Sequence, residues 1–160
     1  MQTIKALQQQ FPYPGKLTWI GLRPSPKQAL LCVAEVRADT RSGLLGDRYS
    51  GRSGKRQVTL LQQEHLAVIA ALTGKPVTPA MLRRNLVVHG INLQALLKQP
   101  VQIGTAVLLI TGHCHPCSRM ENIFGPGGYN ALRGHGGVTA QVITNGMMHI
   151  GDAVIKLQIS

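Results

Sequence analysis

The sequence has 160 residues, of which 44% are hydrophobic and only 4% aromatic, with 18 glycines, 9 prolines and 3 cysteines. A chain of this length fits one domain and buries roughly two-thirds of its unfolded surface, so it needs no disulfides to hold a core. Three unevenly spaced cysteines do not form a secreted disulfide framework and suit a reducing compartment. The formal charge of +11 indicates an anionic partner.

The basic residues do not follow the pattern of a nucleic-acid-binding protein. They are spread along the chain, no basic run alternates with aromatic residues, and no helix-turn-helix or zinc-finger spacing is present. A small anionic molecule is therefore preferred over nucleic acid as the main partner. No stretch approaches the ~20 apolar residues of a membrane span, and glutamines interrupt the first ten residues, so we expect a cytoplasmic protein without a signal peptide or a membrane partner.

The first third of the chain predicts strands separated by loops. Residues 1–15 form a lead segment, because two prolines near its end prevent regular pairing. Strands are expected at residues 17–22 and at the apolar residues 29–36. Residues 37–55 are rich in Gly, Ser and Arg and are expected to form a loop. The alternating residues 56–60 predict the next strand.

The middle of the chain predicts short helices around one strand. Residues 62–72 place apolar side chains at helical spacing and end before Gly74, a residue suited to the position after a helix. A Thr-Pro pair can start a second short helix at residues 78–81. A strand is expected at residues 85–88 and another short helix at residues 92–98.

The last third predicts a β structure. Residues 106–111 form an apolar run, and residues 138–142 and 155–159 alternate between apolar and polar side chains. Asn145-Gly146 between them is typical of a hairpin turn. Two similar Gly-containing turns lead into strands, at residues 103–107 and 150–154. We therefore predict a mainly β fold with a few short helices, closed into a barrel rather than left as an open sheet.

The densest cluster of reactive side chains is His-Cys-His-Pro-Cys at residues 113–117, and it has several interpretations. A C-x-x-C pair can be a redox dithiol, but no thioredoxin-like βαβ unit is evident. The cluster could bind zinc with help from His135 or His149, but a closed site needs two regular pairs and only one is present. Both cysteines could also be small, buried hydrophobic residues.

The remaining interpretation is a single reactive thiolate, which His115, Arg119 and the basic loops would favour. A thiolate is a soft ligand that suits molybdenum, copper or persulfide sulfur. We expect Cys32, inside an apolar strand, to be buried and slow to react. Cys114, at a strand end, competes with Cys117 for the role of the reactive thiol.

Two other segments are candidate anion sites. Arg83 and Arg84 can present planar donors to a phosphate, although such pairs also occur on solvated surfaces. The glycines of residues 134–137 allow backbone N–H groups to approach an anion, with His135 as a further donor, or they form a plain tight turn.

Taken in order, these segments resemble the MOSC family, the domain found at the C-terminus of molybdenum cofactor sulfurases. The resemblance extends from about Trp19 to Val154 and is closest to the short stand-alone bacterial members. It implies a predominantly β barrel with a few helices over residues 16–160. It is carried by Gly46-Asp47, residues 56–60, Glu64, residues 83–88, Gly90, Leu93, Ile103-Gly104, Pro116-Cys117, residues 134–137 and residues 151–154.

The resemblance implies a molybdopterin-type molybdenum cofactor held through one cysteine, which falls on Cys117 as both the catalytic residue and the metal ligand. Reduction of N-hydroxylated compounds is the implied reaction. Electrons or sulfur would come from a redox or sulfur-donor protein, because the pyridoxal-phosphate and ferredoxin modules of larger relatives are not found here. Pyridoxal phosphate is not expected to bind this domain alone. The cofactor-binding residues would be Arg83, Arg84, Asn85, His135, Gly136 and Gly137.

Two alternatives remain open. In the first, the chain is a sulfur carrier that holds a persulfide on Cys117 and transfers it to an acceptor. In the second, it is a non-enzymatic zinc-binding or nucleic-acid-binding protein.

Overall fold

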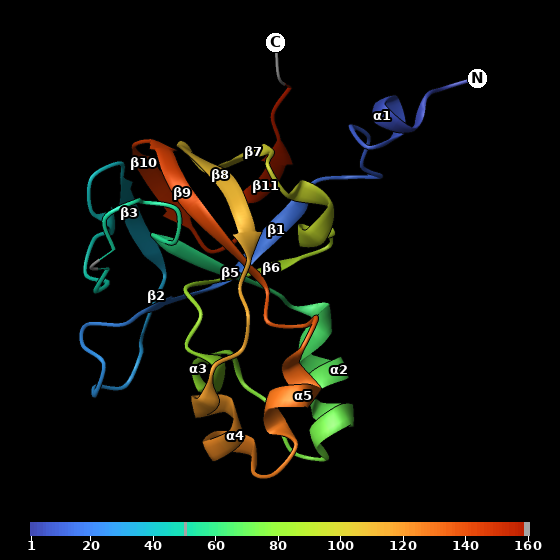
Figure 1. Ribbon diagram of the computed structural model, residues 1–160. Coiled ribbons are helices and arrows are strands. Elements are labelled where there is room, and N and C mark those ends of the chain that lie inside the picture. Colours follow the sequence, from blue (N-terminus) through green and yellow to red (C-terminus); the bar gives the residue numbers. More distant parts are fainter. Residues whose placement is uncertain (50, 159–160) are drawn as a thin grey trace.

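The computed structural model describes residues 1–49 and 51–158, and its main element is a closed β-barrel (Figure 1). One eight-stranded sheet has the order β11-β7-β8-β9-β5-β6-β1-β2, and pairing of β11 with β1 closes 7 of these strands into the barrel. β5 and β6 are parallel, and the other neighbours are antiparallel. The strands are β1 (Gly15–Leu22), β2 (Leu31–Val33), β5 (Val58–Gln62), β6 (Leu86–His89), β7 (Pro100–Ile103), β8 (Ala106–His113), β9 (Val138–Thr144) and β11 (Ala153–Lys156).

The predicted barrel is confirmed, and most of its strands lie where the sequence pattern places them. The closing strand β11 begins earlier than predicted, and the predicted strand residue Ile159 lies outside the described residues. The apolar run at 29–36 is not one strand. It divides into β2, which borders β1, and β3 (Glu35–Asp39), which belongs to a second, three-stranded sheet with β4 (Gly43–Leu44) and β10 (Gly146–His149).

The hairpin predicted at Asn145-Gly146 is wrong. β10 follows β9 after a single residue and pairs with β3 instead of folding back on β9. A glycine is needed at position 146 because the chains approach closely: a Cβ there would lie 2.3 Å from the carbonyl carbon of Thr105. Asn145 accepts a 2.8 Å hydrogen bond from the backbone N–H of Thr40, which ties the second sheet to the loop before β4.

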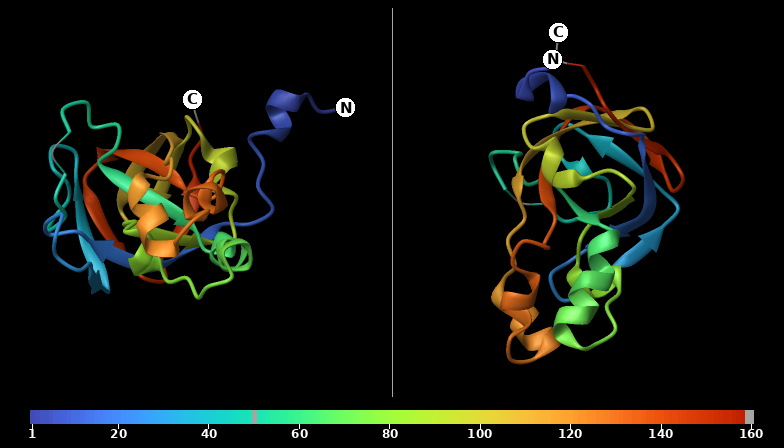
Figure 2. Two further views of the ribbon diagram at one scale, coloured as in Figure 1. Left: turned by 60° about the horizontal axis from the view of Figure 1, so that its bottom comes forward. Right: turned by 90° about the vertical axis from the view of Figure 1, so that its right-hand side faces the viewer.

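Four helices, α2–α5, gather beneath one end of the barrel, while α1 and both chain termini lie at the other end (Figures 1 and 2). The helices predicted at 62–72 and 78–81 are confirmed as α2 and α3, whereas α4 and α5 were not predicted. No helix among the described residues is long and apolar enough to cross a membrane. The helices are α1 (Ile4–Leu7), α2 (Glu64–Thr73), α3 (Pro79–Leu82), the 3-10 helix η1 (Leu93–Leu96), α4 (Ser118–Phe124) and α5 (Gly128–Leu132).

β5 and β6 are buried on both faces, because the barrel covers one face and the helices cover the other. Leu60 and Leu86 point into the barrel core, while their neighbours Leu61 and Val87 pack in a second cluster with Phe124 and other side chains of α2–α5. This explains why all of Val58–Gln62 is buried although the segment alternates only partly. The helical layer is therefore fixed to the barrel where α3 leads into β6 and where β8 leads into α4.

Candidate functional site

A buried asparagine anchors the backbone at the end of the barrel that faces the helices. The side-chain oxygen of Asn85 accepts a 3.0 Å bond from the backbone N–H of Thr59, and its side-chain amide donates a 3.1 Å bond to the carbonyl of Gly21. The same amide donates a 3.0 Å bond to Oδ1 of Asp47. Asn85 is completely buried, so these bonds are shielded from water. It therefore joins β1, β5 and the loop that carries Asp47.

Asp47, which is bonded to Asn85, in turn binds Arg23. Its carboxylate accepts bonds of 2.7 Å and 3.2 Å from the backbone N–H and Nε of Arg23, and its second oxygen lies 3.1 Å from an Nη atom of the same guanidinium. The Asp47 side chain has no exposed surface, whereas a quarter of the Arg23 side chain is exposed. Such a two-pronged pair fixes the direction of the guanidinium. Arg23 is thus held at the surface by a chain of bonds that begins in the core.

Four arginines surround a hollow beside this pair. Arg23, Arg48, Arg83 and Arg119 line it with Ser25 and Pro26, and its volume is about 200 Å³. These arginines come from the end of β1, the loop before β5, the end of α3 and the first turn of α4. The backbone N–H of Arg48 donates a 2.7 Å bond to the carbonyl of Arg23, which joins two of these segments. We call this site the arginine hollow.

The electrostatics of the arginine hollow favour an anion. Burial lowers the pKa of Arg83 below its ordinary value, the charges of Arg119 and Arg23 lower it further, and Asp47 opposes the shift. Arg83 also has a left-handed backbone with φ of 54°, a strained conformation for a residue other than glycine. Its guanidinium donates to the carbonyls of Ser25 and Gln28 at 3.3 Å and 3.1 Å. The fold therefore crowds cations that repel one another, and an anion would relieve that repulsion.

Cys117 lies on the turn that begins α4, close in sequence to a residue that lines the arginine hollow. It is the N-cap residue of α4, its side chain makes no capping bond, and it is exposed. Arg119, two residues further on, lines the hollow. An exposed thiol and a guanidinium of the hollow are therefore presented by one turn of the chain. This turn was not expected to be helical.

Cys114 and Cys32 differ from the sequence-based expectations. Cys114, which was expected to be half exposed because it is at a strand end, is 5% exposed and thus buried. Cys32 was expected to be buried and is exposed, because its strand β2 lies outside the closed barrel at the edge of the sheet. All three cysteines are free. β8 and β9, on either side of the C-x-x-C segment, are antiparallel, so the segment is not part of a βαβ unit.

The zinc interpretation gains no support from the described part of the chain. Within residues 1–49 and 51–158, no three His, Cys, Asp or Glu side chains are placed so that they could hold a metal ion. The rings of His113 and His115 are tilted, with centroids 6.3 Å apart, and both residues are exposed.

The predicted residues Gly136 and Gly137 line a second hollow of about 210 Å³, which we call the glycine hollow. Arg84 is buried, and its guanidinium donates to the carbonyls of Gly136 and Leu82 at 2.8 Å and 2.9 Å. A Cβ at Gly136 would lie 2.2 Å from the Cys114 carbonyl oxygen, and one at Gly137 would lie 2.0 Å from the Leu60 carbonyl oxygen. Close backbone approach therefore requires both glycines. The hollow is lined by Gln94, His113, Cys114, His115, Pro116, Gly134, Gly136 and Gly137.

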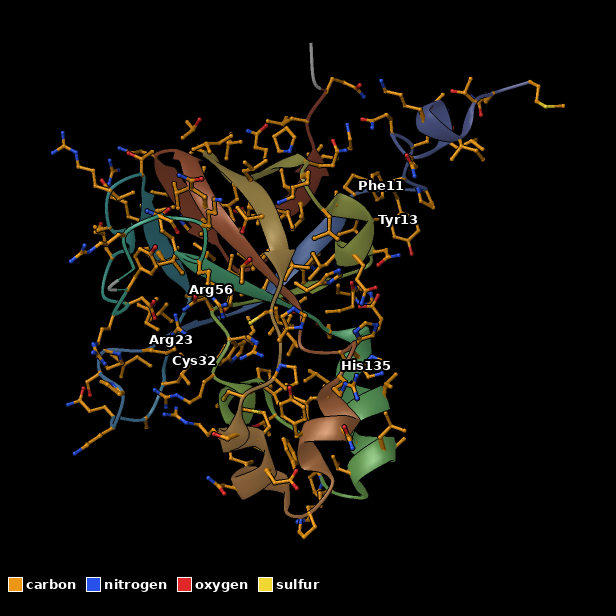
Figure 3. The ribbon with its side chains drawn as sticks, in the orientation of Figure 1. Phe11, Tyr13, Arg23, Cys32, Arg56 and His135 are labelled. Atoms are coloured by element: carbon orange, nitrogen blue, oxygen red, sulfur yellow. The ribbon has the colours of Figure 1, made fainter. Side chains whose placement is uncertain are left out.

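His135 is not in the lining of either hollow. Its ring packs edge-on against His65 of α2 with centroids 5.0 Å apart, and its Nδ1 is buried without a hydrogen-bond partner among the described residues. Figure 3 shows His135 beside α2 and α5, well separated from Arg23. Burial lowers the pKa of His65, the charge of His135 lowers it further, and Glu64 opposes the shift.

The structure thus divides five of the predicted site residues into three groups, while His135 lines neither hollow and Cys117 is at the start of α4. Arg83 lines the arginine hollow, Gly136 and Gly137 line the glycine hollow, and Arg84 and Asn85 make buried bonds that hold these regions together. Sequence reasoning did not select Arg23 or Arg48, because they are distant from each other and from the Arg83-Arg84 pair in the chain. The signal that could have indicated them is Asp47, since no other acidic residue occurs between Asp39 and Glu64.

Comparisons with known proteins agree with this architecture. The sequence model of the MOSC domain family matches residues 39–155. No functionally curated protein matches the chain. Among solved structures, the YuaD protein from Bacillus subtilis has a TM-score of 0.77 at 20% identity, covering 91% of this chain and 98% of its own. YiiM from Geobacillus stearothermophilus has a TM-score of 0.74 at 18% identity, covering 91% and 76%. YiiM from Escherichia coli has a TM-score of 0.72 at 18% identity, covering 93% and 72%.

Proposed function

The chain belongs to the MOSC domain family, and from this premise we propose that it binds a molybdopterin-type molybdenum cofactor with Cys117 as the protein ligand of molybdenum. The observation that carries the proposal is the position of Arg119. It lines the arginine hollow and stands two residues after the exposed thiol of Cys117. A candidate phosphate-binding group and a soft metal ligand on one turn match the phosphate and the metal of such a cofactor.

The residues of the arginine hollow fit a phosphate. It contains four guanidinium groups and one nearby carboxylate, Asp47, which is already bonded to Arg23 and Asn85. Its volume of about 200 Å³ is below the ~300–1,000 Å³ of pockets that enclose a whole drug-sized ligand. It therefore suits one end of the cofactor. Arg23, Arg48, Arg83 and Arg119 would hold the phosphate.

We propose that the pterin binds at the glycine hollow. Gly136 and Gly137 bring backbone close to the Cys114–Pro116 segment, and Arg84 ties Gly136 to the end of α3. We propose that Arg84 and Asn85 position the binding groups. The assignment of His135 to the cofactor rests on the family resemblance alone.

The reaction that we propose is reduction of an N-hydroxylated compound. The N–O bond breaks, and with two electrons and two protons the products are an amine and water. Bound molybdenum would supply the redox chemistry. The electrons would come from a separate redox protein. The Cys117 side chain would hold the metal, and the arginines would orient the cofactor.

The exposure of Cys117 also supports the sulfur-carrier alternative. In that function, a persulfide donor passes its outer sulfur to the Cys117 thiolate, which leaves a donor thiolate and a Cys117 persulfide without net oxidation. A thiol without a capping bond at the surface is open to such an exchange.

Anaerobic purification from a molybdenum-replete host tests these functions. The cofactor proposal predicts co-purified molybdenum and a fluorescent oxidised pterin released on denaturation. A sulfur carrier would contain neither and would carry a persulfide, which is detected as the sulfide that mild reduction releases. Zinc without pterin would contradict both.

A further inference from the structure

All six acidic side chains have hydrogen-bond or ion-pair partners among the described residues. Asp39, Glu64, Glu121 and Asp152 accept backbone N–H bonds, Asp47 is bound by Arg23, and Glu35 lies 2.8 Å from Nε2 of His149. The pKa of Glu121 is lowered by the N–H groups of Tyr129 and Gly127, which shows that this carboxylate is stabilised as an anion. With the exception of Asp47, these acidic side chains are therefore held, in the described part of the chain, by local contacts and not by ion pairs with Lys or Arg.

The basic side chains are almost all uncompensated. The chain has 17 Lys and Arg residues, and among the described residues only Arg23 forms an ion pair with a carboxylate. The arginine hollow accounts for three of the others. Backbone carbonyls accept hydrogen bonds from Lys75, Arg84, Lys98 and Lys156. Several exposed cations of the described chain therefore have neither an ion pair nor a place in the proposed cofactor site.

A group of these unpaired cations lies on loops that supply part of the lining of the arginine hollow. Lys27, Arg52, Lys55 and Arg56 are all exposed and lie on the two loops that supply Ser25, Pro26 and Arg48 to the hollow. We call these four residues the cationic collar. No acidic residue occurs between Arg48 and Gln63 to offset it.

The longer loop of the collar connects the arginine hollow with the strand that leads to Cys117. At one end of its longer loop, the N–H of Arg48 bonds to the carbonyl of Arg23. At the other end, the carbonyl of Lys55 accepts a bond from the hydroxyl of Thr111 in β8, six residues before Cys117. Figure 3 shows Arg56 and Arg23 on the same side of the molecule. A partner that touches the collar would therefore approach the cofactor site.

We propose that the cationic collar is the docking surface for an acidic protein that delivers electrons to the site; this inference rests on the proposed cofactor function. Exposed charges around a site contribute mainly to the rate and orientation of association with a partner of opposite charge. They are too exposed to hold a small anion tightly. An acidic patch on a redox protein has the complementary chemistry and a size that can span the collar.

Nucleic acid fits this surface less well than an acidic protein. Among the described residues of the two collar loops, Tyr49 is the one aromatic side chain, and its hydroxyl accepts a 2.9 Å bond from the N–H of Gly54. Trp19, near the same end of the barrel, packs against the helical core cluster. The collar therefore lacks the aromatic platform on which single-stranded bases would stack.

The test is the association rate with an acidic bacterial flavodoxin at low salt, with poly-L-glutamate as a second acidic probe. In the collar variant, Arg52→Glu/Lys55→Glu/Arg56→Glu, we expect the association rate constant to fall about tenfold while dissociation changes little. The matched control, Lys5→Glu/Lys16→Glu/Lys156→Glu, lowers the net charge equally at the opposite end of the barrel and should lower the rate about twofold or less. If the glutamates disturb folding, glutamine substitutions at the same collar positions replace them. These variants should give an intermediate loss of the association rate.

Equal loss of rate in the collar and control variants would overturn the proposal, because it would show an effect of net charge alone. Failure of both acidic probes to associate with the wild type would also overturn it. So would collar-dependent binding of a short DNA duplex that is tighter than flavodoxin binding. Molybdenum content, measured on the same preparations, separates these outcomes from a failure of the cofactor proposal.

Discussion

The side-chain amide of Asn85 donates a 3.0 Å hydrogen bond to the carboxylate of Asp47, 38 positions earlier in the chain. Because Asp47 also binds Arg23, one core asparagine determines the position of a guanidinium in the arginine hollow. The same asparagine is bonded to Thr59 and Gly21. The stability of the barrel end and the geometry of the candidate site are therefore linked.

Replacement of Asn85 should lower the stability of the barrel end and disturb the geometry of the candidate site. Asn85→Leu leaves the buried N–H of Thr59 without its side-chain acceptor and removes a donor from Asp47, so we expect a loss of about 3 kcal/mol in the free energy of unfolding. Urea denaturation measures this loss. Asn122→Ala, at an exposed position on α4, is the control and should change stability by less than about 0.5 kcal/mol. Similar losses in the two variants would show that the Asn85 bonds are not important for stability.

Repulsion between the arginines of the arginine hollow should lower the stability of the protein when no anion is bound. We expect Arg119→Ala to lower the affinity for inorganic phosphate about tenfold, because a charge-assisted donor is lost. Without phosphate, the same variant should be at least as stable as the wild type, because a like charge near Arg83 is removed. Thermal unfolding with and without phosphate measures both effects. Arg133→Ala, exposed and outside the lining of the hollow, should change neither.

Substitution by lysine should have different effects at Arg83 and Arg84. Arg84→Lys loses donors to two backbone carbonyls in a buried site, so we expect a loss of about 2 kcal/mol in stability and a small effect on phosphate affinity. Arg83→Lys keeps the charge but loses the planar fork, so phosphate affinity should fall more than stability. The opposite pattern would make Arg84 the anion-binding residue.

The barrel could be predicted from the sequence because its strands show alternating or apolar patterns that do not depend on the rest of the fold. The Asn145-Gly146 turn was misassigned because the same dipeptide serves a close backbone contact as well as a hairpin turn. The helices α4 and α5 were missed because they are short and are separated by Gly125-Pro126-Gly127, which reads as a loop. The local sequence pattern does not show that packing against the barrel stabilises such short helices.

The candidate site was predicted only in part for a similar reason. Cys117 and Arg83 belong to segments whose residue types indicate chemistry by themselves. The arginine hollow is formed by four segments that are distant in sequence, so its existence depends on the barrel topology. The exposure of Cys32 likewise depends on β2 lying outside the closed barrel, which its apolar neighbours do not reveal.

His65 should make stability depend on pH. Its pKa is lowered in the folded state, so the unfolded chain binds its proton more readily. The contribution is complete above the ordinary value of about 6.5 and is lost as the pH falls below it. Urea midpoints between pH 7.5 and pH 5 should therefore decrease with acidity, and less so in His65→Gln. An identical decrease in that variant would assign the dependence to other groups.

The exposure of the thiols predicts their order of alkylation. Cys32 and Cys117 should be labelled quickly at neutral pH, whereas Cys114 should be labelled slowly until the protein is denatured, because it is 5% exposed. Peptide mapping after brief treatment with iodoacetamide measures this order. Fast labelling of Cys114 in the folded protein would place it at the surface and restore it as a competitor of Cys117.

The molybdenum content of Cys117→Ser, compared with that of Cys32→Ser, tests the central claim most directly. Both variants remove an exposed thiol, so they are matched in chemistry and accessibility. After anaerobic purification from a molybdenum-replete host, we expect Cys32→Ser to retain as much molybdenum and pterin as the wild type and Cys117→Ser to lose the metal. Molybdenum retained at the wild-type level in Cys117→Ser would contradict the assignment of Cys117 as its ligand.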